Sequence, residues 1–595
     1  MVRPTFGGFQ TALTSLQSNS KKLDVTSQNL ANMNVEGYTR QQLKTSSLNY
    51  NNPTSFYMNE NDVNVGFGVS MDEVVQLRDQ FLDIQYRDQN TKYSYNKTTE
   101  YSLNTLGSFM DESNMDGIRA SLDDVQTALT TMQDTSKVQD PVYEGQLQST
   151  LNATSVLLNS AASKIKTAED NEFEKLYGEG TSEGGAVEKI NYLLQEIGEL
   201  NKQIKHNQIM GNKALELQDE RNMKIDELSS YIPITVESFS ETYTVDGKER
   251  MKIYRYNQTG EIAGKSDWPS DLRISLDYTT TDANGAVKKE SIILVNGTYD
   301  DGYGKNYGQV KLTTNDDGSP KYTKWNSTIE DAPGPLDVQL DFISTATDKK
   351  GDPATAKSIT TANSTSKKEV EEGSTTTFAT FSGGSVQAGL DMLAKSDPSK
   401  QATTGLKQGT YYGYDYYMDQ LDNLAQTLAQ EFNKYNYKGN TGIDPTSTTN
   451  LDQYAMLVNR DSGTTAGITA ENVALNKNWI NGDVHIGLMG SDSNETILNM
   501  LRSMTQPHSE LGDKTFANYM NTLSTRLAND QANNKDALDT NKIVLDSITS
   551  SKDQLSGVSL DEEAANMMIY VSSYNAAAKV MSAFDETLQT LLGIV

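Results

Sequence analysis

Apolar residues near the N-terminus recur with the spacing of a narrow helical seam. One seam position is filled every seven residues by a large apolar side chain: Phe9, Leu16, Leu23 and Leu30. The interleaved position begins with an apolar residue and continues with polar ones: Leu13, Ser20, Ser27 and Asn34. Such spacing places one stripe along an α-helix, as in a coiled coil. The pattern predicts a first helix ending near residues 34–37, where Gly37 is suited to a left-handed stop.

A matching seam runs along the C-terminal end of the chain. Its members alternate in steps of four and three residues, with Asp585 as the one polar position: Leu560, Ala564, Met567, Val571, Tyr574, Ala578, Met581, Leu588 and Leu592. Ser559 and Glu562 have the spacing of a capping box, which starts a helix. The pattern predicts a last helix about 50 Å long.

Further apolar stripes between the two ends predict amphipathic helices. Their members are Val74, Leu77, Phe81 and Ile84; Val187, Ile190, Leu194, Ile197 and Ile204; Met418, Leu421, Ala425, Leu428, Phe432 and Tyr435; and Phe516, Met520, Leu523 and Leu527, continuing towards Val544 and Ile548. Because a helix of this kind buries only one face, each stripe needs a partner. The stripes predict a helical bundle that both halves of the chain build.

Residues 231–384 follow a different pattern. Apolar and polar residues alternate there, as at Leu272, Ile274 and Leu276, and six of the twelve prolines lie in this stretch. Period-two alternation between turn signals is typical of β-strands. The stretch is therefore predicted to be a mostly-β module inserted between two helical segments.

Together these patterns predict a multidomain α+β protein. We expect a terminal coiled-coil domain from residues 1–35 and 557–595, and an inserted mostly-β outer domain from residues 231–384. Between them, residues 36–230 and 385–556 are expected to form a mainly helical domain, a bundle closed by both halves of the chain. This nested order predicts an elongated molecule with both termini at one end and the insert at the other.

Composition and charge narrow the classes of partner. The chain has 595 residues and a net charge of −29, with 51 Lys and Arg against 80 Asp and Glu. Such an acidic chain repels phosphate backbones and anionic membrane surfaces, so neither nucleic acid nor a membrane is an expected partner. No run of eighteen apolar residues and no cleavable secretory signal is recognised. The absence of cysteine excludes disulfides and thiolate chemistry.

The sequence offers no convincing catalytic, metal or cofactor site. The three histidines, His206, His485 and His508, are not within metal-ligand spacing of one another. Paired carboxylates are explained by turns and helix caps. The tyrosine-rich stretch 411–417 is predicted to pack at hydrated protein interfaces, since no basic groove for base stacking surrounds it. We therefore expect neither an enzyme nor a bound cofactor.

The two seams leave two interpretations open. The terminal helices can pair within one chain as a hairpin-like bundle, or neighbouring chains can complete their seams. Several seam positions are polar or small, so an isolated pair buries little apolar surface. This burial has to offset about 1–2 kcal/mol of backbone ordering per residue. We expect the ends to be marginal or disordered when isolated and ordered when packed in a polymer.

Three segments resemble the bacterial flagellar axial proteins. Residues 29–41 read Asn-Leu-Ala-Asn-Met-Asn-Val-Glu-Gly-Tyr-Thr-Arg-Gln, which resembles the N-terminal signature of rod, hook and hook-associated proteins. The Tyr-Thr-Arg-Gln that follows the glycine is most similar to hook-associated proteins at the hook–filament junction. Residues 556–566 and 574–580 resemble the matching C-terminal signature. Residues 215–222, with Asp219 and Arg221, resemble the Asp-x-Arg helix that precedes the inserted domain of those proteins.

The resemblance implies a structural component that joins hook to filament outside the cell. Such proteins are exported unfolded through the flagellar type III apparatus and assemble through their terminal helices. The implied partners are further copies in a helical homo-oligomer, the hook protein, a second junction protein adjoining the filament, and a cytoplasmic chaperone on the C-terminal helix. The seam residues listed above would form the assembly interface. The signature turn would be carried by Asn32, Gly37, Tyr38 and Arg40.

Two alternatives remain at this point. The chain can be another axial protein, such as a hook protein or a flagellin-like protein. Less favoured is a secreted adhesin or enzyme carried on the β insert, for example one that binds glycans through exposed tyrosines.

Overall fold

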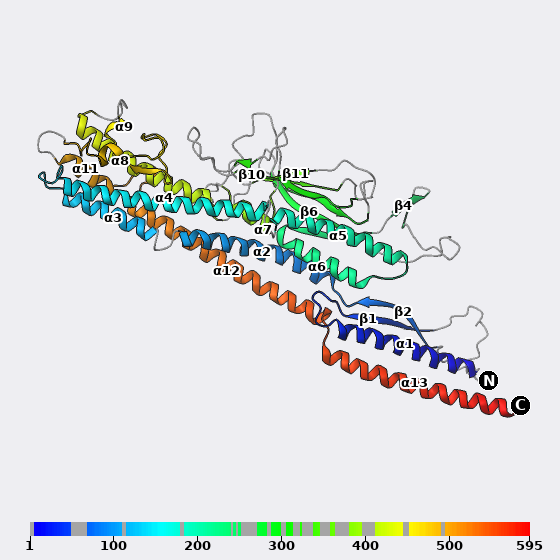
Figure 1. Ribbon diagram of the computed structural model, residues 1–595. Coiled ribbons are helices and arrows are strands. Elements are labelled where there is room, and N and C mark those ends of the chain that lie inside the picture. The colour runs from blue at the N-terminus through cyan, green and yellow to red at the C-terminus, as the bar shows by residue number, and fades with distance from the viewer. Residues whose placement is uncertain are drawn as a thin grey trace.

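The computed structural model describes sixteen stretches of the chain: residues 5–48, 68–109, 115–178, 184–239, 242–245, 248–251, 271–281, 287–298, 305–312, 322–323, 337–345, 358–362, 380–394, 411–443, 451–488 and 494–594. The α-helices are α1 (Thr5–Ala31), α2 (Gln80–Phe109), α3 (Met115–Thr131), α4 (Pro141–Tyr177), α5 (Ala186–Ile209), α6 (Leu215–Tyr231), α7 (Ser385–Met392), α8 (Tyr414–Thr441), α9 (Leu451–Tyr454), α10 (Lys477–Ile480), α11 (Glu495–Thr505), α12 (Phe516–Ser556) and α13 (Leu560–Ile594). Long helices dominate and run roughly along one axis (Figure 1).

The strands form small antiparallel sheets. They are β1 (Gln41–Ser47), β2 (Val69–Gln76), β3 (Ile234–Phe239), β4 (Thr242–Val245), β5 (Lys248–Met251), β6 (Asp271–Thr281), β7 (Val287–Asn296), β8 (Gln309–Leu312), β9 (Tyr322–Thr323), β10 (Asp337–Ile343), β11 (Ser358–Ala362), β12 (Leu457–Asn459) and β13 (Val473–Leu475). One sheet has the order β3-β6-β7 and another the order β11-β10-β8, with β9 beside β10. The predicted mixed α+β class agrees with these elements, whereas the domain boundaries stay a prediction.

One continuous apolar core joins the long helices to the strands between residues 231 and 384. It includes Leu103, Leu194 and Phe432 from the helices and Ile274 and Phe342 from the strands. Within the described residues, none of its members comes from α1 or α13. The terminal helices are therefore attached to the rest of the molecule by other contacts.

The predicted position of the insert at the far end of the molecule is wrong. Figure 1 shows the strands lying beside α5 near the middle of the long axis, while α3, α9 and α11 form the end opposite the termini. The chain returns from the strands beside α2, where the Gly384 amide donates to the Thr91 carbonyl (3.0 Å). Because α4 and α8 extend beyond this point, the helices and not the insert form the far end.

The predicted helix over residues 74–84 is also wrong. Val74 lies in β2, opposite Leu43 of β1, and α2 begins only at Gln80. Phe81 and Ile84, expected on a buried face, are exposed. Residues 69–76 form a strand because β-branched Val69, Val74 and Val75 favour one. An apolar residue every three or four positions is a weak helix signal over so short a stretch.

The tyrosine-rich stretch 411–417 is buried and does not form the predicted hydrated interface. Tyr414 and Tyr417 are within the core, and Tyr412 packs on Tyr416 with ring centroids 4.3 Å apart. The Arg526 guanidinium lies 4.6 Å from the centroid of the Tyr412 ring. Burial raises the pKa of the Tyr417 hydroxyl. These tyrosines therefore contribute to stability and are unavailable for glycan binding.

Replacing Asp530 beside this cluster by asparagine is expected to stabilise the protein at neutral pH. Burial raises the pKa of Asp530 to about 6, and its Oδ2 atom has no hydrogen-bond partner among the described residues. Since the folded-state pKa exceeds the unfolded one, stability from this group is lost as pH rises from about 4 through 6. After allowance for solvent screening, Asp530→Asn should raise the free energy of unfolding by about 1 kcal/mol at pH 7.5.

Urea unfolding at pH 4.5 and 7.5 measures this difference. The gain should be smaller at the lower pH, where the native carboxyl is already protonated in the fold. Asp536→Asn, on the exposed face of the same helix, is the matched control and should show no such pH dependence. Equal gains for both variants would contradict the assignment.

Candidate assembly interface at the paired terminal helices

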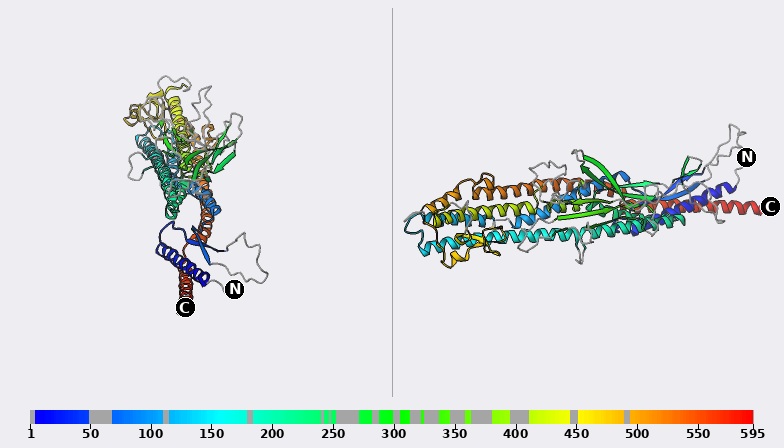
Figure 2. Two further views of the ribbon diagram at one scale, coloured as in Figure 1. Left: turned by 90° about the vertical axis from the view of Figure 1, so that its right-hand side faces the viewer. Right: turned by 90° about the horizontal axis from the view of Figure 1, so that it is seen from above.

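The two terminal helices pack against each other as an antiparallel pair. Asn29 contacts Glu563 near one end, and the Lys22 ammonium lies 5.5 Å from the centroid of the Tyr570 ring farther along. At the other end, a Cβ atom on Gly8 would lie 2.4 Å from the Phe584 ring. Along this contact the residue number rises in α13 by as much as it falls in α1, which makes the two helices antiparallel. The views in Figures 1 and 2 show this pair projecting from the end of the molecule that carries both termini.

The predicted N-terminal seam lies beside the α13 contact. Its members are half-buried: Phe9, Leu13, Leu16, Leu23 and Leu30. Thr14 and Val25 of α1 are fully buried and face the β1–β2 hairpin. At about 100° per residue, the leucine seam and the hairpin contacts lie on opposite faces of α1.

The predicted C-terminal seam is likewise offset from the α1 contact. Leu560, Val571 and Tyr574 expose between 41% and 56% of their surface, and Ala564 is also exposed. The remaining described members are half-buried: Met567, Ala578, Met581 and Leu588. Leu592 belongs to α13, but its side chain lies outside the described residues. The face that packs on α1 instead consists of residues spaced seven apart: Glu563, Tyr570, Ala577 and Phe584. Because Glu563 is polar, apolar spacing alone does not predict this face.

The exposed parts of the two seams form one surface. Counted at about 100° per residue, each lies about a quarter turn from the α1–α13 contact, in the same rotational sense along its own helix. In an antiparallel pair, equal rotations from the contact lead to the same side of the pair. We call this surface the terminal strip: Phe9, Leu13, Leu16, Leu23, Leu560, Ala564, Val571, Tyr574 and Ala578.

The signature turn is organised by Asn29, a residue outside the predicted set. The Asn29 Oδ1 atom accepts hydrogen bonds from the Tyr38 hydroxyl (2.9 Å) and the Gln41 amide (3.0 Å), and its Nδ2 atom donates to the Gln41 carbonyl (3.0 Å). Burial, followed by nearby carboxylates, raises the pKa of Tyr38 to about 12, so its hydroxyl stays a donor. Asn32 donates to the Gln28 carbonyl at the end of α1.

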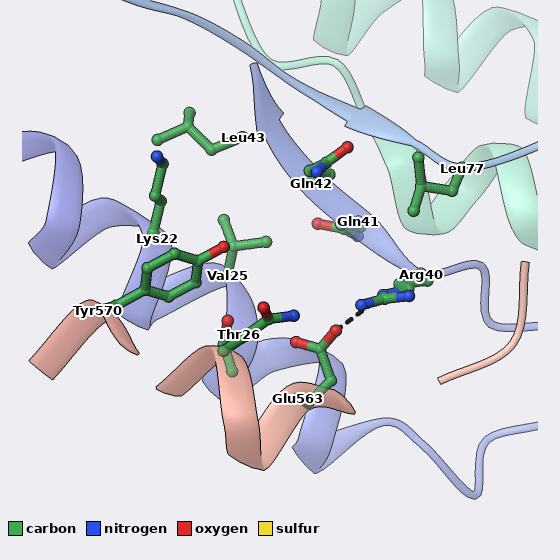
Figure 3. A pocket seen from close by; sticks show the side chains of 11 residues that line it. Lys22, Val25, Thr26, Arg40, Gln41, Gln42, Leu43, Leu77, Glu563 and Tyr570 are labelled. Carbon is green, nitrogen blue, oxygen red and sulfur yellow. Dashed lines mark hydrogen bonds and ion pairs between the residues drawn. The ribbon is translucent and has the colours of Figure 1, made fainter. Parts of the chain in front are cut away.

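Arg40 connects the signature turn to the start of α13. Its Nε atom donates to Glu563 Oε1 (2.7 Å) and its Nη1 atom to Glu562 Oε2 (2.7 Å). Its backbone amide donates to the Ser556 carbonyl at the end of α12 (2.8 Å). Figure 3 shows Arg40 and Glu563 facing each other beside a cleft of about 100 Å³, which Lys22, Gln41 and Tyr570 also line.

Thr39 connects the same turn to α6. Its hydroxyl donates to Asp219 Oδ1 (2.6 Å) and its amide to Asp219 Oδ2 (3.0 Å). Burial raises the pKa of the Asp219 carboxyl, although both Thr39 groups stabilise its charged form. Arg221, two residues on, donates to Asn201 of α5 (2.8 Å). In the Asp-x-Arg pair, Asp219 thus contacts the signature turn, and Arg221 contacts α5, the helix beside the strands.

Gly37 has a backbone conformation and a position that favour glycine. Its φ is +77°, and a Cβ atom would lie 2.0 Å from the Met223 sulfur on α6. Gly37→Ala is expected to weaken docking of the terminal helices by about 2 kcal/mol or more, from left-handed strain plus the clash. Hydrogen exchange of the α1 amides measures this loss.

Gly211→Ala separates the two contributions in the Gly37 experiment. Gly211 has a φ of +89°, and no described atom lies within 4 Å of its added Cβ, so this control carries the backbone strain alone. The loss at Gly37 should exceed that at Gly211, and Met223→Ala should restore part of it. Equal effects would show that contact with α6 is unimportant.

The geometry favours a structural site. Within the described stretches there is no cluster of three or more His, Cys, Asp or Glu side chains that could hold a metal ion. The described helices also include none that is long and apolar enough to cross a membrane. What the site does is fix the orientation of the paired helices on the body and leave one side of the pair uncovered.

Comparisons with known proteins agree with the resemblance seen in the sequence. The family model described as "Flagellar hook-associated protein FlgK helical domain" matches residues 103–298. Those described as "Flagella basal body rod protein" and "Flagellar basal body rod FlgEFG protein C-terminal" match residues 9–39 and 554–594. Flagellar hook-associated protein 1 of Bacillus subtilis (strain 168) is 25% identical over 99% of this chain and 98% of its own length. Over nearly its whole length the chain is therefore similar to flagellar hook-associated protein 1.

A second relative extends the same finding. Flagellar hook-associated protein 1 of Salmonella typhimurium is 22% identical over 98% of this chain and 99% of its own length. Among solved structures, the flagellar hook junction protein FlgK from Burkholderia pseudomallei matches 60% of this chain and 44% of that chain, with 14% identity and a TM-score of 0.32. The prediction of a hook-associated protein with a structural function in the flagellum is confirmed, and the similar proteins named above are flagellar structural proteins.

Proposed function

We propose that the protein joins hook to filament through its terminal strip, as part of a helical homo-oligomer. The supporting observation is that Leu560, Val571 and Tyr574 stay exposed after α1 and α13 have paired. A monomer gains nothing from a row of apolar side chains in water, whereas a large side chain gains about 1.5–3 kcal/mol when a neighbour buries it. The helices pair within one chain, as the first interpretation of the seams has it, and we propose that other chains cover the remaining side.

Further parts of the proposal follow from the similarity to flagellar hook-associated protein 1. The chain is exported through the flagellar type III apparatus and acts outside the cell. A cytoplasmic chaperone covers the C-terminal helix before export, which suits a helix with exposed Met568, Ile569 and Val580 as well as the terminal strip. In the flagellum, the hook protein and a second junction protein adjoin the oligomer on its two sides.

Deleting the terminal helices tests the proposal. A chain lacking residues 5–31 and 560–594 should keep its apolar core, since none of the described core members lies in α1 or α13. Circular dichroism and urea unfolding of the shortened chain check its folding, and its binding to isolated hook–filament junctions checks assembly. A folded chain that still occupied the junction would refute the proposal.

A further inference from the structure

A second uncovered apolar surface lies on the helical body, on the part nearest the terminal helices. Phe81 and Ile84, in the first turns of α2, expose 63% and 56% of their surface. Val544 and Leu555 of α12 are also exposed, and Ile548 between them is half-buried. We call these five residues the body patch.

The packing of α2 on α12 brings the body patch together. The two helices are antiparallel, with Gln89 donating to Asn541 (2.9 Å) and Asn96 to Asn534 (2.8 Å). Continued along both helices, this register places Phe81 level with the stretch between Ile548 and Leu555. At about 100° per residue, Phe81 and Val544 are rotated from this contact in the same sense. Ile548 and Leu555 instead continue the line of Asn541 to and beyond the level at which α2 begins. Phe81 and Val544 therefore lie on one side of the helix pair, Ile548 and Leu555 follow at its end, and Ile84 extends the patch outwards.

The opposite side of the pair is already occupied by α6. Arg87 of α2 pairs with Asp226 of α6 (2.7 Å), and Asn90 donates to Ser229 (2.9 Å). Lys552 of α12 bridges Asp226 (2.8 Å) and Asp83 (3.2 Å). These buried and half-buried ion pairs hold the three helices in fixed orientation, so the body patch is a preformed surface.

The α12 members have the spacing of a seam for another helix. Val544, Ile548, Ser551 and Leu555 follow one another in steps of four, three and four residues, which is coiled-coil spacing. Leu555 is also separated from Leu560 of the terminal strip only by the short joint around Gly557. The body patch thus continues the row of uncovered apolar residues from α13 onto α12.

We propose that the body patch binds a helix of a second copy of this chain. The inference rests on the proposed function, because a helical homo-oligomer brings each copy's terminal strip against a neighbour. An interface of this kind is repeated between every pair of neighbours. The surface adjoining the terminal strip then also lies at the boundary between copies. A helix laid on it would cover Phe81 and the α12 seam together.

Photo-crosslinking from Phe81 tests this contact in the assembled protein. Benzoyl-phenylalanine is placed at position 81 of the full chain, in cells whose own copy has been removed, and isolated flagella are irradiated. The expected product is an adduct of two copies of this chain, formed in flagella and not in purified monomer. Tyr101 is the matched control position, since it is equally exposed on α2 but lies under the Lys175 ammonium at 3.5 Å. It should give no such adduct.

The outcomes distinguish this inference from the proposed function. A chain that is present in flagella but gives no adduct, or an adduct with a different protein, overturns the second-copy contact alone. A chain absent from flagella overturns the proposed function and this inference with it. As an independent check, Val544→Glu should lower the amount of chain on flagella about tenfold or more, because burial of an unpaired charge is costly. Ser550→Glu, exposed on the opposite side of α12, should leave that amount unchanged.

Discussion

Val571→Asp is expected to abolish incorporation of the chain into flagella while leaving the monomer folded. Val571 is exposed in the terminal strip, so a carboxylate there is harmless in the single chain. In the assembled state the same carboxylate would be buried without a partner, at a cost of several kcal/mol. The loss of the valine burial adds about 1.5 kcal/mol or more. Since each tenfold in binding corresponds to about 1.4 kcal/mol, assembly should fall below detection.

The amount of chain on isolated flagella and swimming of the cells measure this effect. Circular dichroism of the purified variant should match that of the native chain. Ser572→Asp places the same charge on an exposed position next to Val571 but on a different side of α13, and it should assemble. Normal assembly of both variants would show that the terminal strip is not part of the assembly interface.

Glu563→Gln is expected to loosen the paired helices far more than Glu562→Gln. Both glutamates accept from Arg40 at 2.7 Å, but their side chains are 3% and 63% exposed, respectively. Breaking a buried ion pair from one side costs about 3 kcal/mol or more, whereas an exposed pair contributes about 0–1 kcal/mol. The Glu563 variant should also weaken the contact with Asn29, and so disturb the signature turn.

Hydrogen exchange of the α1 and α13 amides in the full chain reads out this docking. The two substitutions remove the same charge from neighbouring residues, so any difference between them comes from burial and geometry. An equal rise in exchange for both would mean that Arg40 acts through its overall charge and not through the buried contact. Exchange in the core, for example at Leu194, should be unchanged in either variant.

Much of the fold follows from periodicity because the long helices have regular apolar faces. The stripe from Phe516 to Leu527 is buried as predicted, but its continuation to Val544 and Ile548 is not. Val544 is rotated away from the contact that Asn541 makes with Gln89, and Ile548 lies level with the first turn of α2, which begins at Gln80. Apolar spacing does not predict the β1–β2 hairpin, because Leu43 is the one apolar residue of β1 and no alternation of apolar and polar residues marks that strand. The mid-length position of the insert depends on where α4 and α8 end relative to α6, which no local pattern specifies.

The candidate site was predictable only in part. Signature matching identified Gly37, Tyr38 and Arg40, and the structure gives each a distinct contact. Asn29 and Glu563 could not be found from apolar spacing, because they are polar residues buried in a mostly polar junction. A buried polar residue becomes recognisable only when its partners are known, and Asn29 and Glu563 are more than five hundred residues apart in the chain. The presence of both the N-terminal and the C-terminal signature in one chain is the sequence feature that points to this contact.

The arrangement of Asp219 and Arg221 has a mechanical consequence. Asp219, which binds Thr39 of the signature turn, and Arg221 are less than one turn of α6 apart. Arg221 donates to Asn201, and Asn201 donates to the Leu272 carbonyl of β6 (3.3 Å). The paired ends are therefore linked to β6 by a short series of hydrogen bonds that does not include the joint at Gly557. We therefore expect the strands around β6 to follow the terminal helices when these helices turn.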